Sequence, residues 1–283
     1  MGQAGFLPKP KEFSMKRFVS PLIVLLGFAG QAFGQAADEL AHKAFSDWNY
    51  HNNAGWRAVT REQFDSAERH FRAAVIVIRP HDADDPRLLA HSYNDLAWVL
   101  HKQGRSREAQ PLADWALKIR EVKVGPSAEA TAQTLFVLGS IEAELGHLDQ
   151  AETCFARTLA IHEARYGANS SSVTAALIDL AGAQSARRKF SQAETAFNRV
   201  LDTPSRFLAD DDPNRALALT GLADLEKTKG ETDKAVEHLR KAIAIHERIS
   251  PPDSAIRLKL NQKLQGLLNQ EKSPQAKPSS GTK

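Results

Sequence analysis

Small and large apolar residues recur along this chain with a period of 42 residues. The clearest copy of the pattern runs from Leu89 to Glu121. On both sides of Gly104 its apolar residues fall three or four positions apart, which places them on one face of a helix. The copy therefore predicts two helices joined by a tight turn at the glycine.

When the copies are aligned, several columns of equivalent residues stay in phase through five units. One column is alanine throughout: Ala67, Ala109, Ala151, Ala193 and Ala235. A second column holds only glycine or alanine: Gly55, Ala97, Gly139, Ala181 and Ala223. A third column is mostly large: Phe71, Ala113, Phe155, Phe197 and Leu239. The turn column holds Gly104, Gly146 and Gly230, with Glu62 and Arg188 in the other two units.

The sizes of these residues predict how the helices pack. Small residues let the two helices of a hairpin approach closely, and the large residues fill the space beside that contact. Glycine at the turn tolerates the left-handed backbone that ends a helix. Since one hairpin cannot bury all of its apolar surface, neighbouring hairpins must stack on it. The pattern therefore predicts an all-α solenoid of about five helical hairpins.

The period also predicts where the parts of the chain begin and end. The array is expected over residues 35–250, with units near 45–79, 87–121, 129–165, 171–203 and 213–249. The first helix is expected to begin within residues 35–49, and the second helix of the fourth unit is expected to end early, at Thr203-Pro204. Residues 251–269 predict a capping helix with Leu258, Leu260, Leu264 and Leu267, and the polar residues 270–283 predict a disordered tail.

Proline occurs at two predicted helix starts and inside one predicted helix. Asp85-Pro86 and Asp212-Pro213 each place an acidic N-cap before a proline suited to the first helical position. Pro111 falls inside a predicted helix and would remove one backbone hydrogen bond there.

The N-terminus has the layout of a secretory signal. Lys16 and Arg17 follow Met15, a short apolar run covers residues 18–28, and the small-x-small site Ala32-Phe33-Gly34 comes next. We therefore expect residues 1–34 to be an extension and signal peptide, with a start at Met15, cleavage near Gly34 and export to a bacterial periplasm. An uncleaved anchor is the alternative, although the apolar run is short for a membrane span.

Removal of this segment changes the charge of the protein. Of 37 basic and 34 acidic residues, four basic and one acidic lie before residue 35, which leaves 33 of each. A mature protein without net charge gives no electrostatic reason to expect nucleic acid or an anionic membrane as a partner. We expect no stable membrane insertion after cleavage.

The sequence contains no recognisable catalytic or metal-binding motif. Cys154 is the single cysteine and is interpreted as a small packing residue. His162 and His246 lie on different units and are interpreted as scaffold residues, and Asp95 and Asp179 are likewise spread over successive units. With no clustered histidines, nucleophile motif or phosphate loop, we expect no cofactor, no metal and no enzymatic activity.

Several short segments carry a family resemblance. The second unit contains Asn94-Asp95-Leu96-Ala97, Gln103-Gly104-Arg105, Glu108-Ala109-Gln110-Pro111-Leu112 and Ala116-Leu117-Lys118-Ile119-Arg120-Glu121. Over about residues 45–249 the chain resembles tetratricopeptide-repeat proteins, in particular the 42-residue subtype of kinesin light chains. The resemblance implies a right-handed superhelix whose concave surface binds extended peptides or helices.

One stripe of the first helices is expected to line that surface. In the second unit Asn94, Trp98 and His101 fall together about 130° from the face that meets the hairpin partner. The candidate peptide-binding residues are Asn52, Trp56, Asn94, Trp98, His101, Phe136 and Ser140. Packing of the two tryptophans between hairpins, as core residues, is the alternative interpretation.

We therefore expect a non-catalytic protein–protein interaction scaffold that binds an unidentified protein or peptide in the bacterial envelope. Homo-oligomerisation through the groove or a terminal hairpin is the second hypothesis, and an envelope enzyme with a site in the groove is the third. On the second helices, the basic column Arg157, Arg199 and Lys241 is expected to be a solvated outer face, with Trp115 a secondary contact if it is exposed.

Overall fold

The computed structural model describes the backbone of residues 21–81 and 85–272 and the side chains of residues 38–81 and 85–269. These residues form eleven α-helices, one short 3-10 helix and no strand. The helices are α1 (Pro21–Val59), α2 (Phe64–Ile78), α3 (Pro86–Lys102), α4 (Ser106–Lys123), α5 (Glu129–Leu145), α6 (Leu148–Tyr166), α7 (Ser171–Ala186), α8 (Phe190–Leu201), α9 (Pro213–Lys229), α10 (Thr232–Ile249) and α11 (Ala255–Lys272). The 3-10 helix η1 (Arg79–His81) follows α2.

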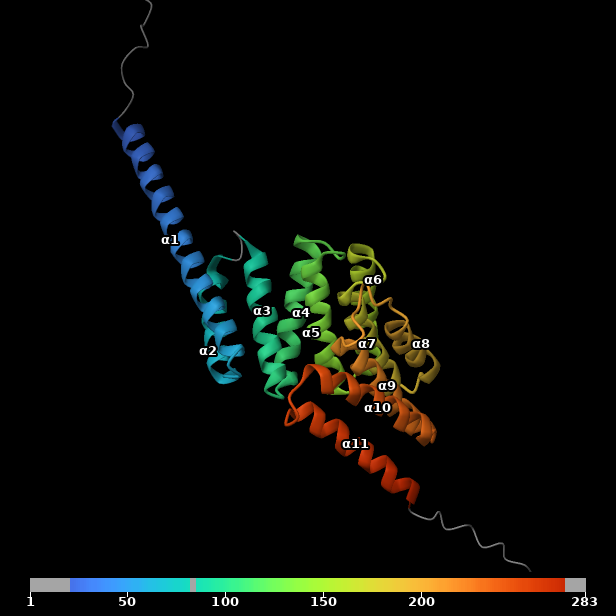
Figure 1. Cartoon of the computed structure of the whole chain (residues 1–283). Coiled ribbons are helices and arrows are strands. Elements are labelled where there is room, and N and C mark those ends of the chain that lie inside the picture. The colour runs from blue at the N-terminus through green and yellow to red at the C-terminus, as the bar shows by residue number, and fades with distance from the viewer. Residues whose placement is uncertain (1–20, 82–84, 273–283) are drawn as a thin grey trace, which may run out of the picture.

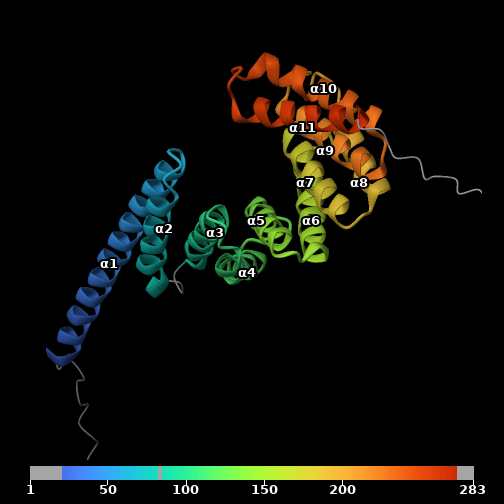
Figure 2. The same cartoon turned by 90° about the horizontal axis from the view of Figure 1, so that it is seen from below.

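Consecutive helices pair as antiparallel hairpins that stand side by side along the molecule (Figure 1). The pairs are α1 with α2, α3 with α4, α5 with α6, α7 with α8, and α9 with α10, and α11 packs on α10. Seen from below, the row curves around an open side that α3, α5 and α7 line (Figure 2). The expected all-α solenoid of five hairpins with a C-terminal capping helix is confirmed.

Helix α1 begins earlier than the sequence pattern indicated. The expected start near residue 35 is wrong for the intact chain, because α1 runs from Pro21 through Gly34 without a break. Met15, the expected initiator methionine, and the basic residues after it lie outside the described residues. Within the part of the chain that the structure describes, no helix combines the length and apolar character needed to cross a membrane.

The turn column predicted from the repeat is a column of left-handed backbone. Gly104, Gly146 and Gly230 have φ angles of 75°, 83° and 83°. Glu62 and Arg188, which occupy the same column, are the non-glycine residues with positive φ among the described residues, at 57° and 61°. The repeat therefore imposes one backbone geometry at all five turns, and two units adopt it with a side chain that disfavours it.

Arg188→Gly is expected to stabilise the protein by about 0.5–1 kcal/mol. Glycine removes a left-handed strain of roughly 1–2 kcal/mol, and the larger entropy of the unfolded glycine offsets part of the gain. Urea unfolding of the purified chain measures the change. Gly146→Ala is the matched control and should lose about 1 kcal/mol, because a Cβ there meets no atom within 4 Å and only the φ of 83° opposes it. A loss of stability in Arg188→Gly would contradict the interpretation.

Glycines inside the helices make room for phenylalanine rings. A Cβ built on Gly55 would lie 2.4 Å from the ring of Phe71, and one on Gly139 would lie 2.8 Å from the ring of Phe155. The alanine column is completely buried in all five units. The columns thus act as predicted, because absent or small side chains on one helix accept large ones from its partner.

The fourth hairpin departs from the others, as predicted. Helix α8 ends at Leu201, and the following loop is held by Arg215 at the start of α9. The guanidinium of Arg215 donates to the carbonyl oxygens of Leu201, Thr203, Leu208 and Ala209 at 2.5–3.0 Å. A single side chain of the next unit therefore satisfies several backbone carbonyl groups of this loop.

The two predicted helix N-caps form, but one of the four leucines of the capping helix does not pack on α10. Asp85 and Asp212 accept backbone N–H bonds from Arg87 and Asn214 at 3.0 and 2.7 Å. Helix α4 continues through Pro111. On α11, Leu260 and Leu267 are buried, but Leu258 is exposed, because it lies on the opposite side of the helix from the contact with α10.

Candidate functional site

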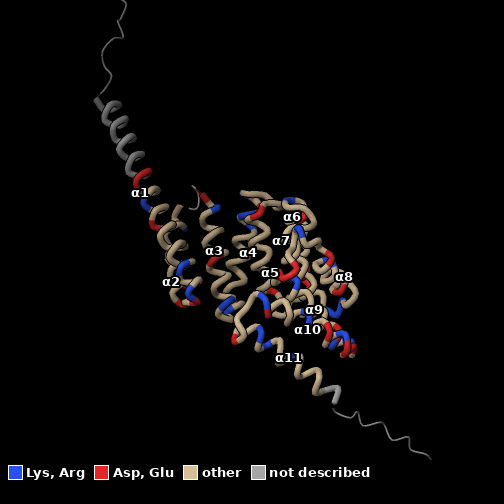
Figure 3. Tube along the Cα trace, in the orientation of Figure 1, with Lys and Arg blue, Asp and Glu red and all other residues tan. Residues whose placement is uncertain are grey.

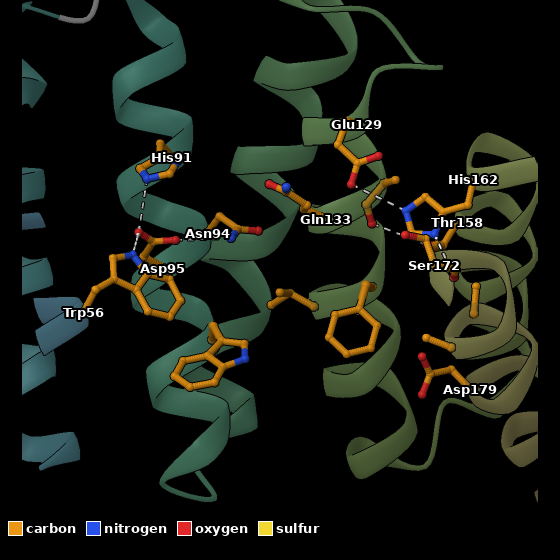
Figure 4. Close-up of a pocket in the computed structure, with 16 residues that line it drawn as sticks. Trp56, His91, Asn94, Asp95, Glu129, Gln133, Thr158, His162, Ser172 and Asp179 are labelled. Atoms are coloured by element: carbon orange, nitrogen blue, oxygen red, sulfur yellow. Dashed lines mark hydrogen bonds and ion pairs between the residues drawn. The ribbon is translucent and has the colours of Figure 1, made fainter. Parts of the chain in front are cut away.

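A pocket of about 540 Å³ opens on the inner side of the curve, among helices of the first four hairpins (Figure 4). Its lining comes from α1, α3, α5, α6 and α7: Trp56, His91, Asn94, Asp95, Trp98, Glu129, Ala132, Gln133, Phe136, Val137, Thr158, His162, Ser172, Ala175, Ala176 and Asp179. Within α3 these residues are spaced by three and four positions, so they share one face of the helix. Large pockets that combine apolar walls with a few polar groups are typical ligand sites.

Asp95 is the centre of a buried polar network at the α1 side of the pocket. Its side chain is 2% exposed. It accepts hydrogen bonds from Asn52 Nδ2 and Trp56 Nε1, both at 2.9 Å, and a longer one from Asn94 Nδ2 at 3.4 Å. His91 Nε2 lies 3.3 Å away (Figure 4). These contacts join the first hairpin to the second and orient the Trp56 ring.

Both tryptophans of the candidate set pack on protein with one side and line the pocket with the other. Their ring centroids lie 5.5 Å apart, and Trp56 meets the edge of Phe71 at 5.6 Å while Trp98 lies 6.4 Å from Phe64. Trp56 is 38% exposed, and Trp98 is half-buried against the core. The two interpretations of these residues, groove and core, therefore describe different faces of the same rings.

The opposite wall carries a second polar group. Glu129 of α5 accepts from Tyr166 Oη at 2.8 Å and lies 3.6 Å from His162 Nε2 and 3.7 Å from Arg165 Nε. His162 of α6 places its Nδ1 3.1 Å from the backbone carbonyl of Ser172. This bond fixes the tautomer, because a carbonyl only accepts and Nδ1 must therefore carry the proton.

Asp179 of α7 points its carboxylate into the pocket without a partner (Figure 4). Among the described residues it makes no hydrogen bond and no ion pair. Burial raises the pKa of Asp179 from 3.8 to about 7, since the charged form has lost water and gained nothing in return. A group of this kind in a pocket costs stability and is characteristic of binding and catalytic sites.

Asp179→Asn is expected to stabilise the protein at pH 8 by about 1–2 kcal/mol and to have little effect at pH 4.5. An acid whose pKa is raised by folding binds more protons in the folded state, so the free energy of unfolding falls as the pH rises from about 4 to about 8. The expected change is smaller than the raised pKa alone implies, because solvent screens the partly exposed side chain. Urea unfolding at the two pH values measures the difference. An equal effect at both would contradict the assignment.

The structure brings four of the seven candidate residues together and leaves three outside the pocket. Trp56, Asn94, Trp98 and Phe136 line it. Asn52 lies behind it, with its amide donating to Asp95. His101 turns toward the third hairpin, where its Nδ1 lies 2.7 Å from Glu144 Oε2, and Ser140 donates to its own helix at Phe136 O. His101 and Ser140 lie outside the pocket, because the open face of the first helices lies closer to their N-termini than the stripe of Asn94, Trp98 and His101. Whether they contact a peptide stays a prediction.

Sequence reasoning missed several polar residues of the pocket. His91, Asp95, Glu129, Gln133, His162 and Asp179 were not among its candidates. One signal was present: Asp95 and Asp179 lie two periods apart and therefore occupy the same column of the repeat. The interpretation of His162 as a scaffold residue is incomplete, since its ring both ties α6 to α7 and lines the pocket.

Outside the pocket, acidic and basic residues are interspersed over the array (Figure 3). In the basic column, Arg157 and Arg199 pair with Glu121 and Glu163 of the preceding hairpins, each at 2.5 Å. The column is therefore partly used for contacts between units. Trp115 is 53% exposed beside Tyr93. The described residues contain no group of three potential metal ligands.

A curved stack of helical hairpins with a lined inner pocket defines a helical-repeat scaffold, and the comparisons with known proteins identify its type. Sequence profiles described as tetratricopeptide repeat match residues 89–127, 128–206 and 178–254, together more than half of the chain. The chain belongs to the tetratricopeptide-repeat family, whose members are generally protein-interaction scaffolds.

Solved structures show the same fold at low sequence identity. A Podosopora anserina protein designated a kinesin light chain, with nearly identical TPR-like repeats, is 18% identical with a TM-score of 0.62, covering 71% of this chain and 95% of that one. BtubC (BKLC) from P. vanneervenii is 19% identical with a TM-score of 0.63, covering 81% and 94%. YrrB, a TPR protein with an unusual peptide-binding site, is 19% identical with a TM-score of 0.50, covering 82% and 98%. No curated protein sequence is significantly similar to this chain.

Proposed function

We propose that this protein is a non-catalytic scaffold that binds a segment of a partner protein, as a peptide or a helix, on its inner surface. The observation that carries the proposal is the pocket of about 540 Å³ that spans four hairpins. Trp56 and Phe136 are each 38% exposed there, which is unusual for large aromatic side chains inside a concave surface. Rigid aromatic anchors in a pocket contribute much of the energy at protein interfaces.

We further propose that the protein works in the bacterial envelope after cleavage near Gly34. The described side chains of α1 that are buried are Ala44, Trp48, Asn52 and Ala58, all beyond the cleavage point. These contacts of the first hairpin would remain after removal of residues 1–34. Mass spectrometry of the protein recovered from a periplasmic fraction should find an N-terminus near residue 35. Recovery of the intact chain from the cytoplasm alone would contradict this proposal.

The binding proposal is tested by selecting peptides from a random library on the full chain. Ala175 is exposed on α7 and lines the pocket, so Ala175→Trp fills the space without disturbing the core. Ala164 is exposed on α6 outside the pocket, which makes Ala164→Trp the matched control. Peptides selected on the wild type should bind the control equally and Ala175→Trp at least about tenfold more weakly. Equal binding to all three proteins would contradict a groove site.

Self-association is the competing function for the same surface. Light scattering of the full chain distinguishes it from partner binding. A dimer that becomes monomeric in Ala175→Trp, but not in Ala164→Trp, would assign the groove to a second copy of this chain. If the wild type and both variants are monomeric, self-association is excluded and the groove remains available to a different partner.

A further inference from the structure

The pocket has an excess of negative charge. Its sixteen lining residues include three carboxylates, Asp95, Glu129 and Asp179, and no lysine or arginine. Asp95 is satisfied by neutral donors and attracts the buried guanidinium of Arg120 behind it. Asp179 has no counterpart among the described residues. An anionic ligand group would be repelled here, and a cation would be attracted.

Two buried polar side-chain atoms of the pocket lack a hydrogen bond, Asn94 Oδ1 and His162 Nε2. Asn94 is 8% exposed, and its Oδ1 has no partner. Its orientation follows from chemistry, because the Nδ2 group must face the carboxylate of Asp95. His162 Nε2 is likewise buried without a hydrogen bond, and the nearest carboxylate oxygen, Glu129 Oε1, lies 3.6 Å away.

Buried acceptors without partners are rare and costly, so they call for a donor. The amide of Asn94 extends from α3 toward α5, and Asp179 points inward from α7 on the far side (Figure 4). A ligand group that satisfies both Asn94 Oδ1 and the Asp179 carboxylate must therefore carry several N–H donors. Among protein side chains arginine fits this description best, since its planar guanidinium has five donors and a permanent positive charge.

The apolar lining suits the rest of an arginine side chain. Trp56, Trp98 and Phe136 present ring surface to the pocket, and such rings attract cations and cover methylene groups. The protein already makes one contact of this type, with Lys102 Nζ 5.6 Å from the centre of the Trp98 ring. Aromatic walls and inward-facing carboxylates thus point to the same kind of side chain.

We propose that the pocket selects partner segments that insert an arginine between the aromatic rings of Trp56, Trp98 and Phe136 and the carboxylate of Asp179. The inference rests on the proposed peptide-binding function and adds the chemistry of the bound side chain. Lysine is the weaker alternative, because its single ammonium group reaches fewer of the separated acceptors. Segments with an acidic residue at this place are rejected.

The test uses the peptides selected on the full chain that lose binding in Ala175→Trp. The most enriched peptide is synthesised with arginine, lysine, leucine or glutamate at its preferred basic position, and each version is titrated against the full chain by calorimetry. Arginine is expected to bind about tenfold more tightly than leucine, with lysine between them and glutamate weakest. The preference for arginine should decrease as the salt concentration rises.

Protein variants assign the preference to the pocket. Asp179→Asn is expected to weaken binding of the arginine peptide about tenfold. The affinity of the leucine version should change less than about twofold. Asp224→Asn is the control, because Asp224 is an exposed carboxylate on α9 that pairs with Lys263 outside this pocket. The affinities of the arginine and leucine peptides should be the same for Asp224→Asn as for the wild type.

The two proposals fail in different ways. Groove-dependent peptides with no basic residue at a fixed position, or with an acidic one, would overturn the arginine site and leave the scaffold function standing. An arginine preference that survives Asp179→Asn unchanged would also overturn it. Absence of any groove-dependent peptide would overturn both.

Discussion

Asp95→Ala is expected to destabilise the protein by about 3–5 kcal/mol. The substitution removes an acceptor that is 2% exposed and serves Asn52, Trp56 and Asn94. These donors then stay buried without a partner, and the guanidinium of Arg120 loses its nearby negative charge. Urea unfolding measures the loss, and fluorescence of Trp56 and Trp98 follows the loosening between the first two hairpins.

Two variants control this result. Asp95→Asn keeps one acceptor oxygen and should cost about 1–2 kcal/mol, less than the alanine variant. Asp224→Asn removes a solvent-exposed carboxylate and should change stability by less than about 0.5 kcal/mol. If Asp95→Ala were as stable as the Asp224 variant, the network would not join the hairpins.

Gly221→Ala is expected to destabilise the protein by about 2–3 kcal/mol. A Cβ at this position would lie 2.2 Å from Cζ of Phe197, whose ring is buried between the fourth and fifth hairpins. Either the ring or helix α9 must shift, and moving a buried ring off its packed position costs stability. Thermal or urea unfolding detects the loss.

Gly182→Ala is the matched control for the clash. Gly182 also lies inside a helix, but a Cβ there meets no atom within 4 Å. Alanine should therefore raise stability by about 0.5–1 kcal/mol through helix propensity alone. Adding Phe197→Leu should recover part of the loss in Gly221→Ala, and strictly additive effects of the two substitutions would contradict the contact.

Much of the fold was predictable because each unit repeats the same local physics. The alanine column, the turn column and the N-cap acids Asp85 and Asp212 act within one hairpin or at its boundary, where sequence spacing determines geometry. Glu62 and Arg188 also adopt the left-handed backbone of their column, although the spacing predicted it only for glycine. The start of α1 did not follow, since a repeat says nothing about residues that precede its first unit.

The candidate site was predictable only in part. The columns indicated that Trp56, Asn94, Trp98 and Phe136 lie on the free side of the first helices, and all four line the pocket. His101 and Ser140 fall outside the pocket because each first helix contacts neighbouring hairpins as well as its own partner, which rotates the open face. Glu129 and His162 were missed because they lie on different helices, and only packing brings them within 3.6 Å.

By itself the sequence determined the architecture: a period of 42 residues, hairpins with small residues at their contacts, and a stack that needs a capping helix. These are local or nearest-neighbour properties, and spacing along the chain expresses them directly. The tertiary structure alone decided where the array opens and what lies in the opening. Phe197 fills a space at Gly221 of the next hairpin rather than in its own unit, and Asp179 faces a pocket whose other walls come from four different helices. Such contacts depend on the angle between stacked hairpins. Packing along the whole array sets this angle, so it cannot be read from any single column of the repeat.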